Sequence, residues 1–361
     1  MKIAYVAEWD FSHPTGVSKK ILSQVRIWNQ LGADAQLHVI SSHQPLQPSK
    51  TILSSNLPGW IKGSPRTYLN KMICAPELAN NIAEQKPDII FYRIGIWYPY
   101  LTGLLRSKPS VIELNSLELN ELDGAGFIKS RIYPWGRRQI LEAAAAFAPV
   151  SHEIAAALSP ERRPCFVCGN GYDFSSMPPV DRKTMSDRPQ ALFVSSDGQF
   201  WQGVDLILKW AAQLPDLDFH LVGISRSQAP ANVIFHGTMY DGELRDLARK
   251  MDFGIGTLAL HRKGMEEASP LKTREYAAWG LPFVYAYRDT DLTSPHPALL
   301  QLPNNENAVL AAVLRVREFA LQWRHQPHDS SRFREPLDRM RKEARRLDFF
   351  KMVAAQPHEG R

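Results

Sequence analysis

The chain has 361 residues, and this length suggests two domains, or one large one, rather than a small module. Hydrophobic residues make up 44% of the chain and charged residues 22%, which argues against a disordered, collagen-like or coiled-coil protein. Forty-three Lys and Arg against 37 Asp and Glu give a net charge of +6, well below the charge density of dedicated nucleic-acid binders. We therefore expect an ordinary folded protein with no nucleic-acid partner.

Short apolar runs alternate with longer helical patterns from the first residues onward, which is typical of βαβ units and a mostly parallel sheet. Lys2 to Ala7 is predicted as the first strand, and apolar residues then recur at helical spacing from Val17 to Leu31. Gly32 ends that helix. Later strands of this half are predicted at Ala35 to Ile40, Asp88 to Tyr92, Ser110 to Leu114, Phe147 to Val150 and Cys165 to Val167.

A polar, Pro-rich stretch without periodicity covers residues 174–189, and we interpret it as a linker. The alternation restarts behind it, and the helical pattern at 335–355 is the last one in the chain. The chain is thus predicted to be of the α/β class, with an N-terminal domain (1–173), a C-terminal domain (190–334) and a last helical segment (335–361).

Two doubly wound domains that face each other would form a cleft at the carboxyl ends of both sheets, where open α/β folds bind their ligands. The first loop from strand to helix, residues 8–16, contains a single glycine, Gly16, instead of the G-x-G-x-x-G of dinucleotide-binding loops. We therefore expect a binding function in the cleft, and a nicotinamide-dependent enzyme is disfavoured.

The sequence EASPLKTREYAAWGLP, which begins at Glu267, carries the most chemical information. Ser269 is a good N-cap and Pro270 suits the first helical position, so a helix with free N–H groups is predicted to begin there. Such a helix start attracts phosphate, and Lys272 adds a cation within the first turn. Glu275 lies about one turn further on, so its carboxylate and that of Glu267 suit ligand hydroxyls on either side of a phosphate.

Glu-x7-Glu followed by Tyr-Ala-Ala-x-Gly-x-Pro resembles the donor-site motif of retaining GT-B glycosyltransferases of the GT4 type, also called glycosyl transferases group 1. Other segments follow the family's order along nearly the whole chain: Gly16-Val17, Pro149 to Ser151, Asn170-Gly171-Tyr-Asp173, Phe193 to Gly203, Leu221 to Gly223 and Phe235 to Gly237. The resemblance implies the GT-B fold, with two facing Rossmann-like doubly wound domains, the first for the acceptor and the second for the donor. It also implies that the last helix returns to the N-terminal domain.

The activity that this resemblance implies is transfer of a sugar, with retention, from a nucleotide-sugar donor to a polysaccharide, oligosaccharide or glycolipid acceptor. No cofactor or metal is implied, since no cluster of carboxylates or His has ligand spacing. As catalytic residues, Glu267 would bind the transferred sugar and Lys272 the diphosphate, while Glu275 would bind the ribose; a surface lysine is the alternative for Lys272. Further donor contacts are implied at Pro270, Leu271, Gly16 and Val17, although the last two also suit a simple tight turn.

One departure from the family's pattern concerns the cations at the diphosphate. Where the family carries an Arg and, six residues later, a Lys before Gly, this chain has Ser196 and Gln202 in the expected donor-binding loop. Cations at a leaving diphosphate each contribute several kcal/mol, so their loss has to be offset or the protein is weakly active or inactive. Lys272, Arg262, Lys263 or a cation of the N-terminal domain are the candidates for such compensation.

Four residues of the N-terminal half are candidates for contacts with the acceptor or the donor sugar. Arg93 follows one predicted strand, and Glu113 and Asn115 follow the next, in a pattern that resembles one subfamily. Because these strands end at the expected cleft, the residues suit contacts with a ligand. An ion pair between Arg93 and Glu113 on adjacent strands is the equally weighted alternative. His13, in the Gly16 loop, either acts on the acceptor or is merely solvated.

A stretch without acidic residues runs from Ala35 to Pro76. It mixes basic and aromatic side chains in the following set: Lys50, Lys62, Arg66, Lys71, Trp60 and Tyr68. Such mixtures suit an anionic membrane surface, so residues 50–72 are predicted to make a peripheral membrane contact, with a solvated face as the alternative.

The expected location is the cytoplasm, and the predicted membrane contact would place the protein peripherally at the inner face of the membrane. No apolar stretch approaches the ~18 to 20 residues of a membrane span, and Glu8 and Asp10 interrupt the first apolar run before it could serve as a secretion signal. Three cysteines fit a reducing compartment. Cys165 and Cys168 have C-x-x-C spacing, but on a strand they would point to opposite faces, so no redox or metal site is expected.

Two rival functions remain open from the sequence. Ser196 and Gln202 favour a non-catalytic GT-B protein that binds a sugar nucleotide or glycan as an assembly partner. A sugar-nucleotide epimerase is the other GT-B alternative, and the Tyr-Ala-Ala-x-Gly-x-Pro context argues against it.

Overall fold

The computed structural model describes residues 1–47, 49–121, 127–158, 161–174, 186–326 and 329–356. The chain divides into two compact units, Met1–Cys168 with Met340–Arg361, and Gly169–Arg339. The second unit thus begins a few residues before the stretch interpreted as a linker, and the last residues of the chain group with the first unit. Most of that stretch, residues 175–185, lies outside the described residues.

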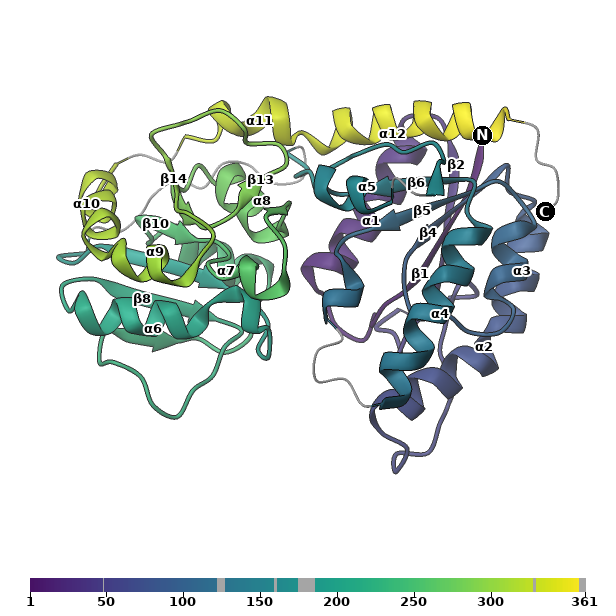
Figure 1. Ribbon diagram of the computed structural model, residues 1–361, viewed down its shortest axis with the longest axis horizontal. Helices are drawn as coiled ribbons and strands as arrows, with labels where there is room; N and C mark the ends of the chain where they lie inside the picture. Colours follow the sequence, from purple (N-terminus) through teal and green to yellow (C-terminus); the bar gives the residue numbers. More distant parts are fainter. Residues whose placement is uncertain (48, 122–126, 159–160, 175–185, 327–328, 357–361) are drawn as a thin grey trace. The chain divides into compact units, whose positions relative to one another are not determined.

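A parallel sheet of six strands in the order β3-β2-β1-β4-β5-β6 forms the centre of the first unit (Figure 1). This is the strand order of a doubly wound Rossmann fold, whose ligands lie at the carboxyl ends of the strands near β1. The strands are β1 (Lys2–Glu8), β2 (Asp34–Ile40), β3 (Ile52–Leu53), β4 (Ile89–Arg93), β5 (Ser110–Leu114) and β6 (Ala146–Pro149).

Helices connect these strands, and a last helix completes the unit: α1 (Gly16–Gln30), α2 (Gly63–Gln85), α3 (Leu101–Arg106), α4 (Phe127–Ala143), α5 (His152–Ala157) and α12 (Arg339–Ala354). Helix α12 is held to α1 by the buried carboxylate of Glu343, which accepts hydrogen bonds from the indole of Trp28 at 2.9 Å and from Gln24 at 3.2 Å. Phe350 packs on Trp28 with a ring distance of 5.5 Å. The last helix is therefore part of the core of the first unit.

The second unit repeats the plan with a parallel sheet in the order β14-β12-β10-β7-β8-β9 and a separate pair, β11 with β13. Its strands are β7 (Gln190–Val194), β8 (Asp218–Val222), β9 (Val233–Phe235), β10 (Phe253–Ile255), β11 (Glu267–Ala268), β12 (Phe283–Tyr285), β13 (Arg288–Asp289) and β14 (Leu299–Gln301). Its helices are η3 (Phe200–Gln202), α6 (Val204–Gln213), α7 (Asp241–Ala248), η4 (Leu260–Lys263), α8 (Leu271–Ala278), α9 (Glu306–Ala311), α10 (Val313–Trp323) and α11 (Ser331–Leu337).

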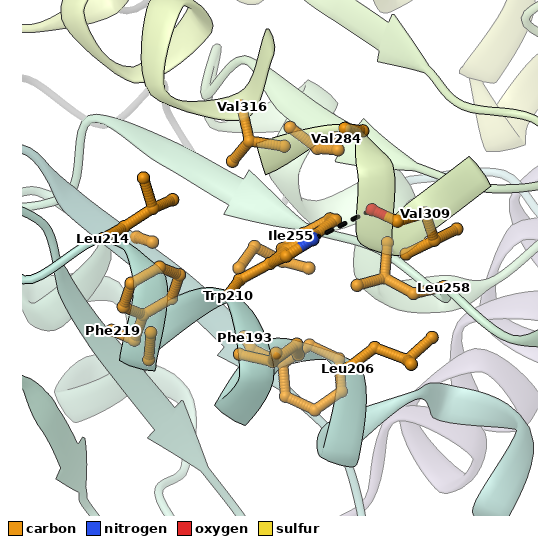
Figure 2. Close-up of a cluster of buried hydrophobic side chains, with 14 of the residues drawn as sticks. Phe193, Leu206, Trp210, Leu214, Phe219, Ile255, Leu258, Val284, Val309 and Val316 are labelled. Atoms are coloured by element: carbon orange, nitrogen blue, oxygen red, sulfur yellow. Dashed lines mark hydrogen bonds between the residues drawn. The ribbon is translucent and has the colours of Figure 1, made fainter. Parts of the chain in front are cut away.

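The core of this second unit surrounds Trp210 of α6 (Figure 2). Its ring is fully buried, and its indole N–H donates to the backbone oxygen of Val309 at 2.9 Å. A buried indole needs such a partner, because an unsatisfied N–H would cost about 1–3 kcal/mol. Phe193 at the end of β7 belongs to the same cluster, so the core also fixes the strand end that leads to the candidate site.

Two predicted elements differ from the observed ones. The strand expected at Cys165 to Val167 is reduced to one bridge between Cys165 and Phe147. The single helix expected over 335–355 is divided, because the backbone of Tyr172 bonds to Leu337 and Arg339 and interrupts it between α11 and α12.

Candidate functional site

Helix α8 begins at Leu271, and Pro270 occupies its N-cap in an extended conformation without a side-chain hydrogen bond to the helix. The prediction that Ser269 caps this helix is wrong. The Ser269 hydroxyl instead accepts hydrogen bonds from the backbone N–H of Asn170 at 2.6 Å and from Arg274 at 2.8 Å. Since no side chain caps α8, the positive end of its dipole is left for an anion.

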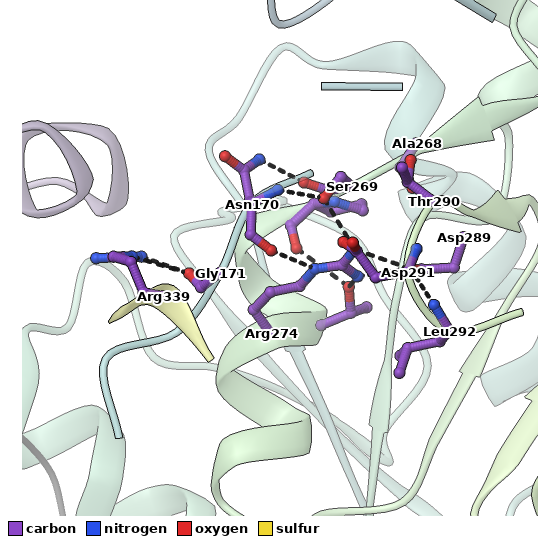
Figure 3. A network of polar contacts seen from close by, with 12 residues as sticks. Asn170, Gly171, Ala268, Ser269, Arg274, Asp289, Thr290, Asp291, Leu292 and Arg339 are labelled. Atoms are coloured by element: carbon purple, nitrogen blue, oxygen red, sulfur yellow. Dashed lines mark hydrogen bonds and ion pairs between the residues drawn. The ribbon is translucent and has the colours of Figure 1, made fainter. Parts of the chain in front are cut away.

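A buried polar network holds the turn before α8 in place (Figure 3). The guanidinium of Arg274 donates to both carboxylate oxygens of Asp289, to Asp291 at 2.8 Å, and to the backbone oxygen of Asn170 at 3.0 Å. The side chain of Asn170 in turn donates to the backbone oxygen of Ser269 at 2.5 Å. Arg274 and Asn170 thus hold the turn before the helix, which gives Asn170 a structural role.

Lys272 in the first turn of α8 points to the end of β7. Its ammonium donates to Oε1 of Gln202 at 2.6 Å and lies 4.0 Å from the centre of the Phe193 ring. Burial lowers the pKa of Lys272 well below its ordinary value. The alternative of a solvated surface lysine therefore does not describe Lys272, and the structure brings together two of the predicted donor-site residues.

The two predicted carboxylates flank the same helix start. Glu267 is buried in β11, which pairs with β13, and it precedes the turn that the network fixes. Glu275 is partly buried on α8 and follows Lys272 by three residues, so both lie on one side of the helix. Burial, and then the charge of Glu275, raise the pKa of Tyr172 to about 12, which places this carboxylate near Tyr172.

Ser196 and Gln202 differ in their surroundings. It is exposed and lines a cavity of about 400 Å³ with Phe200, Arg226 and Arg262, whereas Gln202 is outside that lining. Arg262 forms ion pairs at 2.8 Å with Asp205 and Glu306, which occupy its guanidinium.

The third candidate for compensation in this unit, Lys263, is buried with its ammonium 4.5 Å from the ring of Trp201. Lys263 thus lies beside Trp201, while the ammonium of Lys272 contacts Gln202.

A second cavity, of about 490 Å³, lies in the first unit at the carboxyl ends of β1, β4 and β5. Arg93 and Asn115, which the sequence singled out, line it together with Trp9. The guanidinium of Arg93 is 5.5 Å from the centre of the Trp9 ring. Nδ2 of Asn115 is buried and has no hydrogen-bond partner within the described residues, so it is available as a donor to a ligand.

Glu113 lies beneath this cavity, fully buried, and does not line it. Its carboxylate oxygens lie 2.8 Å from the ammonium of Lys20, 3.0 Å from the guanidinium of Arg93 and 3.6 Å from that of Arg346. Burial alone would raise the pKa of Glu113, but these three cations outweigh it and hold that pKa far below its usual range. The ion-pair interpretation of Arg93 and Glu113 is thus confirmed, and Glu113 fixes the cavity wall from behind.

The remaining predicted residues of the first unit lie outside that cavity lining. His13 is about half exposed, with Nδ1 at 3.1 Å from the hydroxyl of Ser12. Gly16 and Val17 form the start of α1, where Thr15 is the N-cap and accepts the N–H of Ser18 at 3.0 Å. A helix start, rather than an isolated tight turn, is therefore the setting of Gly16 and Val17.

Glu8 and Lys71 line the same cavity and were not identified as a pair from the sequence. Glu8 ends β1, pairs with Lys71 of α2 and accepts the hydroxyl proton of Tyr92 at 2.6 Å. Lys71 is therefore buried. It is not available for the membrane contact that the acid-free stretch had suggested. Arg66 of that stretch likewise donates to backbone oxygens of the loop before α2.

No group of three or more His, Cys, Asp or Glu within the described residues lies close enough to hold a metal ion. Among the described helices, none is both long enough and apolar enough to cross a bilayer.

No protein-family model matches the sequence, and no curated protein matches it. Among solved structures, sucrose-phosphate synthase from Thermosynechococcus elongatus is similar over 98% of this chain and 99% of its own, with a TM-score of 0.72 at 14% identity. The lipopolysaccharide outer core galactosyltransferase WaaB is similar over 97% and 100% (TM-score 0.65, 13% identity), and Anabaena HepE, solved with UDP and glucose, over 98% and 100% (TM-score 0.63, 14% identity). At such identities the likeness shows the fold: the predicted GT-B class, with two Rossmann-like domains, is confirmed.

Proposed function

We propose that this protein is a glycosyltransferase that takes a sugar from a nucleotide-sugar donor and transfers it, with retention and without a metal, to a glycan or glycolipid acceptor. The observation that carries the proposal is the uncapped start of α8, where Lys272 and Glu275 share one side of the helix and Glu267 lies just before it. The GT-B fold supports it, since structural neighbours with that fold include a galactosyltransferase and a protein solved with UDP and glucose.

Each residue of the donor site has a chemical task in this proposal. The diphosphate binds at the helix start, against the backbone of Pro270 and Leu271 and the ammonium of Lys272, as phosphates bind at other helix N-termini. Glu275 accepts hydrogen bonds from the ribose hydroxyls, and Glu267 from the hydroxyls of the transferred sugar. Lys272 and the helix dipole stabilise the charge that develops on the leaving diphosphate.

The acceptor is assigned to the cavity of the first unit. The Nδ2 of Asn115 offers an unpartnered amide donor there, and Arg93 and Trp9 provide a guanidinium and an aromatic ring. Such a mixture of donors, acceptors and aromatic surface suits the hydroxyl groups and apolar faces of a sugar.

Hydrolysis of a panel of UDP-, GDP- and ADP-sugars in the absence of acceptor tests this function. We expect slow release of free sugar from one of these donors, unaffected by EDTA, with proton NMR showing the donor's anomeric configuration in the first-formed sugar. A protein that binds none of the donors and hydrolyses none of them would contradict the proposal.

Ser196 and Gln202 favour a second function, that of a non-catalytic protein that binds a sugar nucleotide. That rival predicts calorimetric binding of the donor without hydrolysis or transfer under any acceptor condition. The panel therefore separates the two functions by comparing binding with turnover.

A further inference from the structure

The contact between Lys272 and Gln202 joins two loops of the second unit that are far apart in sequence. Lys272 stands in the first turn of α8, and Gln202 ends η3, just after the carboxyl end of β7. Their side chains meet at 2.6 Å. The positive charge of Lys272 therefore lies next to residue 202, whose own side chain is uncharged.

The amide of Gln202 has a fixed orientation. Its Oε1 accepts hydrogen bonds from Lys272 and, at 3.1 Å, from the hydroxyl of Thr257, while its Nε2 donates to Gln199 at 2.9 Å. Within the described residues, the groups that contact Oε1 are donors, so an oxygen and not an NH2 group faces the ammonium. Gln202 can therefore position a cation and cannot replace one.

Lys272 lacks the partner that a buried ammonium usually has. Within the described residues, no carboxylate lies at ion-pair distance from it, and its surroundings are the Gln202 oxygen and the face of Phe193. A charge in such a setting is stabilised only by dipoles and by the ring quadrupole, and it gains strongly from an added anion. Arg262, by contrast, already has two carboxylates and gains little.

We propose that Gln202 is the positioning residue of Lys272: its amide oxygen holds the ammonium beside the end of β7, where the proposed function places the donor diphosphate. The inference rests on the proposed donor function and makes it more specific. It explains how the donor site can have a glutamine at residue 202 where the family has a lysine. The positive charge comes from Lys272 on α8 instead of from the loop that contains residue 202.

The test is an exchange of the two side chains. Binding of UDP, GDP and ADP to the wild-type protein is measured by calorimetry, and the diphosphate that binds is compared with its own nucleoside. Lys272→Gln should weaken the diphosphate about 10- to 100-fold and leave the nucleoside unchanged, because a charged hydrogen bond to phosphate is lost. Lys250→Gln, which removes one exposed charge elsewhere in the unit, serves as the matched control.

Gln202 is tested by removal and by exchange. Gln202→Leu should weaken the diphosphate several-fold with no effect on the nucleoside, because the ammonium is no longer held. Gln202→Lys alone brings two ammonium groups into contact and should not improve binding, whereas Gln202→Lys with Lys272→Gln should restore most of the lost affinity.

Three results would overturn the inference. Equal losses of nucleoside and diphosphate in Lys272→Gln would assign it a structural role, and so would a failure of the exchanged pair to restore affinity in a protein with the wild-type melting temperature. Wild-type affinity in Gln202→Leu would remove its positioning role. If the wild type binds no nucleoside diphosphate, the proposed donor function itself fails, which is a different outcome from a bound diphosphate that ignores residues 202 and 272.

Discussion

The partly buried Lys272 and the fully buried Glu113 differ in the charges that surround them. Glu113 is enclosed by three cations that hold its pKa down, so its charge is already compensated inside the fold. Lys272 has a carbonyl oxygen and an aromatic face, and burial lowers its pKa. A compensated buried charge gains little from a further ion, while an uncompensated one next to an uncapped helix start is suited to an anionic ligand.

Replacing Glu275 by Gln tests the assignment of the ribose. The charged acceptor of the ribose hydroxyls is lost, so we expect donor and nucleoside to weaken together by ~1.5 to 3 kcal/mol. Calorimetry with both ligands measures this, and Glu243→Gln, an exposed carboxylate on α7, is the control. A variant that loses diphosphate affinity and keeps nucleoside affinity would contradict the assignment of the ribose to Glu275.

Single residues of the donor motif were predictable from local sequence, but their partners were not. The pattern around Glu267 and Lys272 indicated a helix start that suits phosphate. The bond of Ser269 to Asn170 joins segments 99 residues apart, and the bond of Lys272 to Gln202 joins segments 70 residues apart. Such contacts depend on tertiary packing, which no local propensity contains, so the N-cap role expected for Ser269 was wrong.

At the scale of elements, the long apolar runs and helical periodicities predicted most of the architecture. The strands that the sequence did not indicate, β3, β11, β13 and β14, have only two or three residues and lie at a sheet edge or in the separate pair. A run that short has no period to detect, and pairing with a neighbouring strand is what extends its backbone. The division between α11 and α12 has the same origin, because it depends on the backbone bonds of Tyr172.

His220 on β8 and His236, the residue directly after β9, form a stacked pair that we expect to make stability dependent on pH. Nδ1 of His220 lies 2.8 Å from Nε2 of His236, and Nε2 of His220 lies 2.7 Å from Gln190. Burial, and then His236, lower the pKa of His220 to about 4. Because the folded pKa lies below the unfolded value of about 6.5, stability is complete above pH 6.5 and is lost as the pH falls towards 4.

His220→Gln removes this titration and keeps a polar side chain. We expect the fall in unfolding free energy between pH 7.5 and 4.5 to be smaller in the variant, by up to about 3 kcal/mol. Urea unfolding at both pH values measures it, with His152→Gln, an exposed histidine at the start of α5, as the control. The same fall in both proteins would show that His220 is not the titrating group.

The exposed part of the acid-free stretch leads to a narrower membrane prediction. Lys71 and Arg66 have structural partners, whereas Lys50 and Lys62 are exposed and Trp60 is 80% exposed. Replacing both exposed lysines by Gln and Trp60 by Ser should therefore release the protein from anionic vesicles, at ~1 kcal/mol per charge.

Flotation with vesicles of phosphatidylcholine and phosphatidylglycerol at a ratio of about seven to three measures this release. A Lys108→Gln and Lys250→Gln protein has the same change in charge at other exposed sites and should still float. Equal flotation of all three proteins, or none by the wild type, would exclude the contact.

At the scale of the whole molecule, the fold is similar to solved structures at only 13–14% identity. The alternation of apolar strands and amphipathic helices is therefore what specifies two doubly wound domains, and very different side chains satisfy it. The proposed function depends on far fewer residues, and at two of the expected donor-site positions, Ser196 and Gln202, this chain departs from the pattern that it resembles. The site chemistry consequently has to be judged from the contacts of these residues.

Installing the two absent cations decides whether the donor site lacks charge. In Ser196→Arg with Gln202→Lys, the new ammonium would contact Lys272, and the new guanidinium would join Arg226 and Arg262 around the same cavity. Like charges at contact distance repel by ~1 kcal/mol or more, so we expect turnover to stay level or to fall about 10-fold. Donor hydrolysis under saturating donor measures it, with each single variant as a control. A rise in turnover would mean that the native site is short of charge and that Lys272 does not supply it, while a protein that binds the donor and is inactive before and after the change would support the non-catalytic rival.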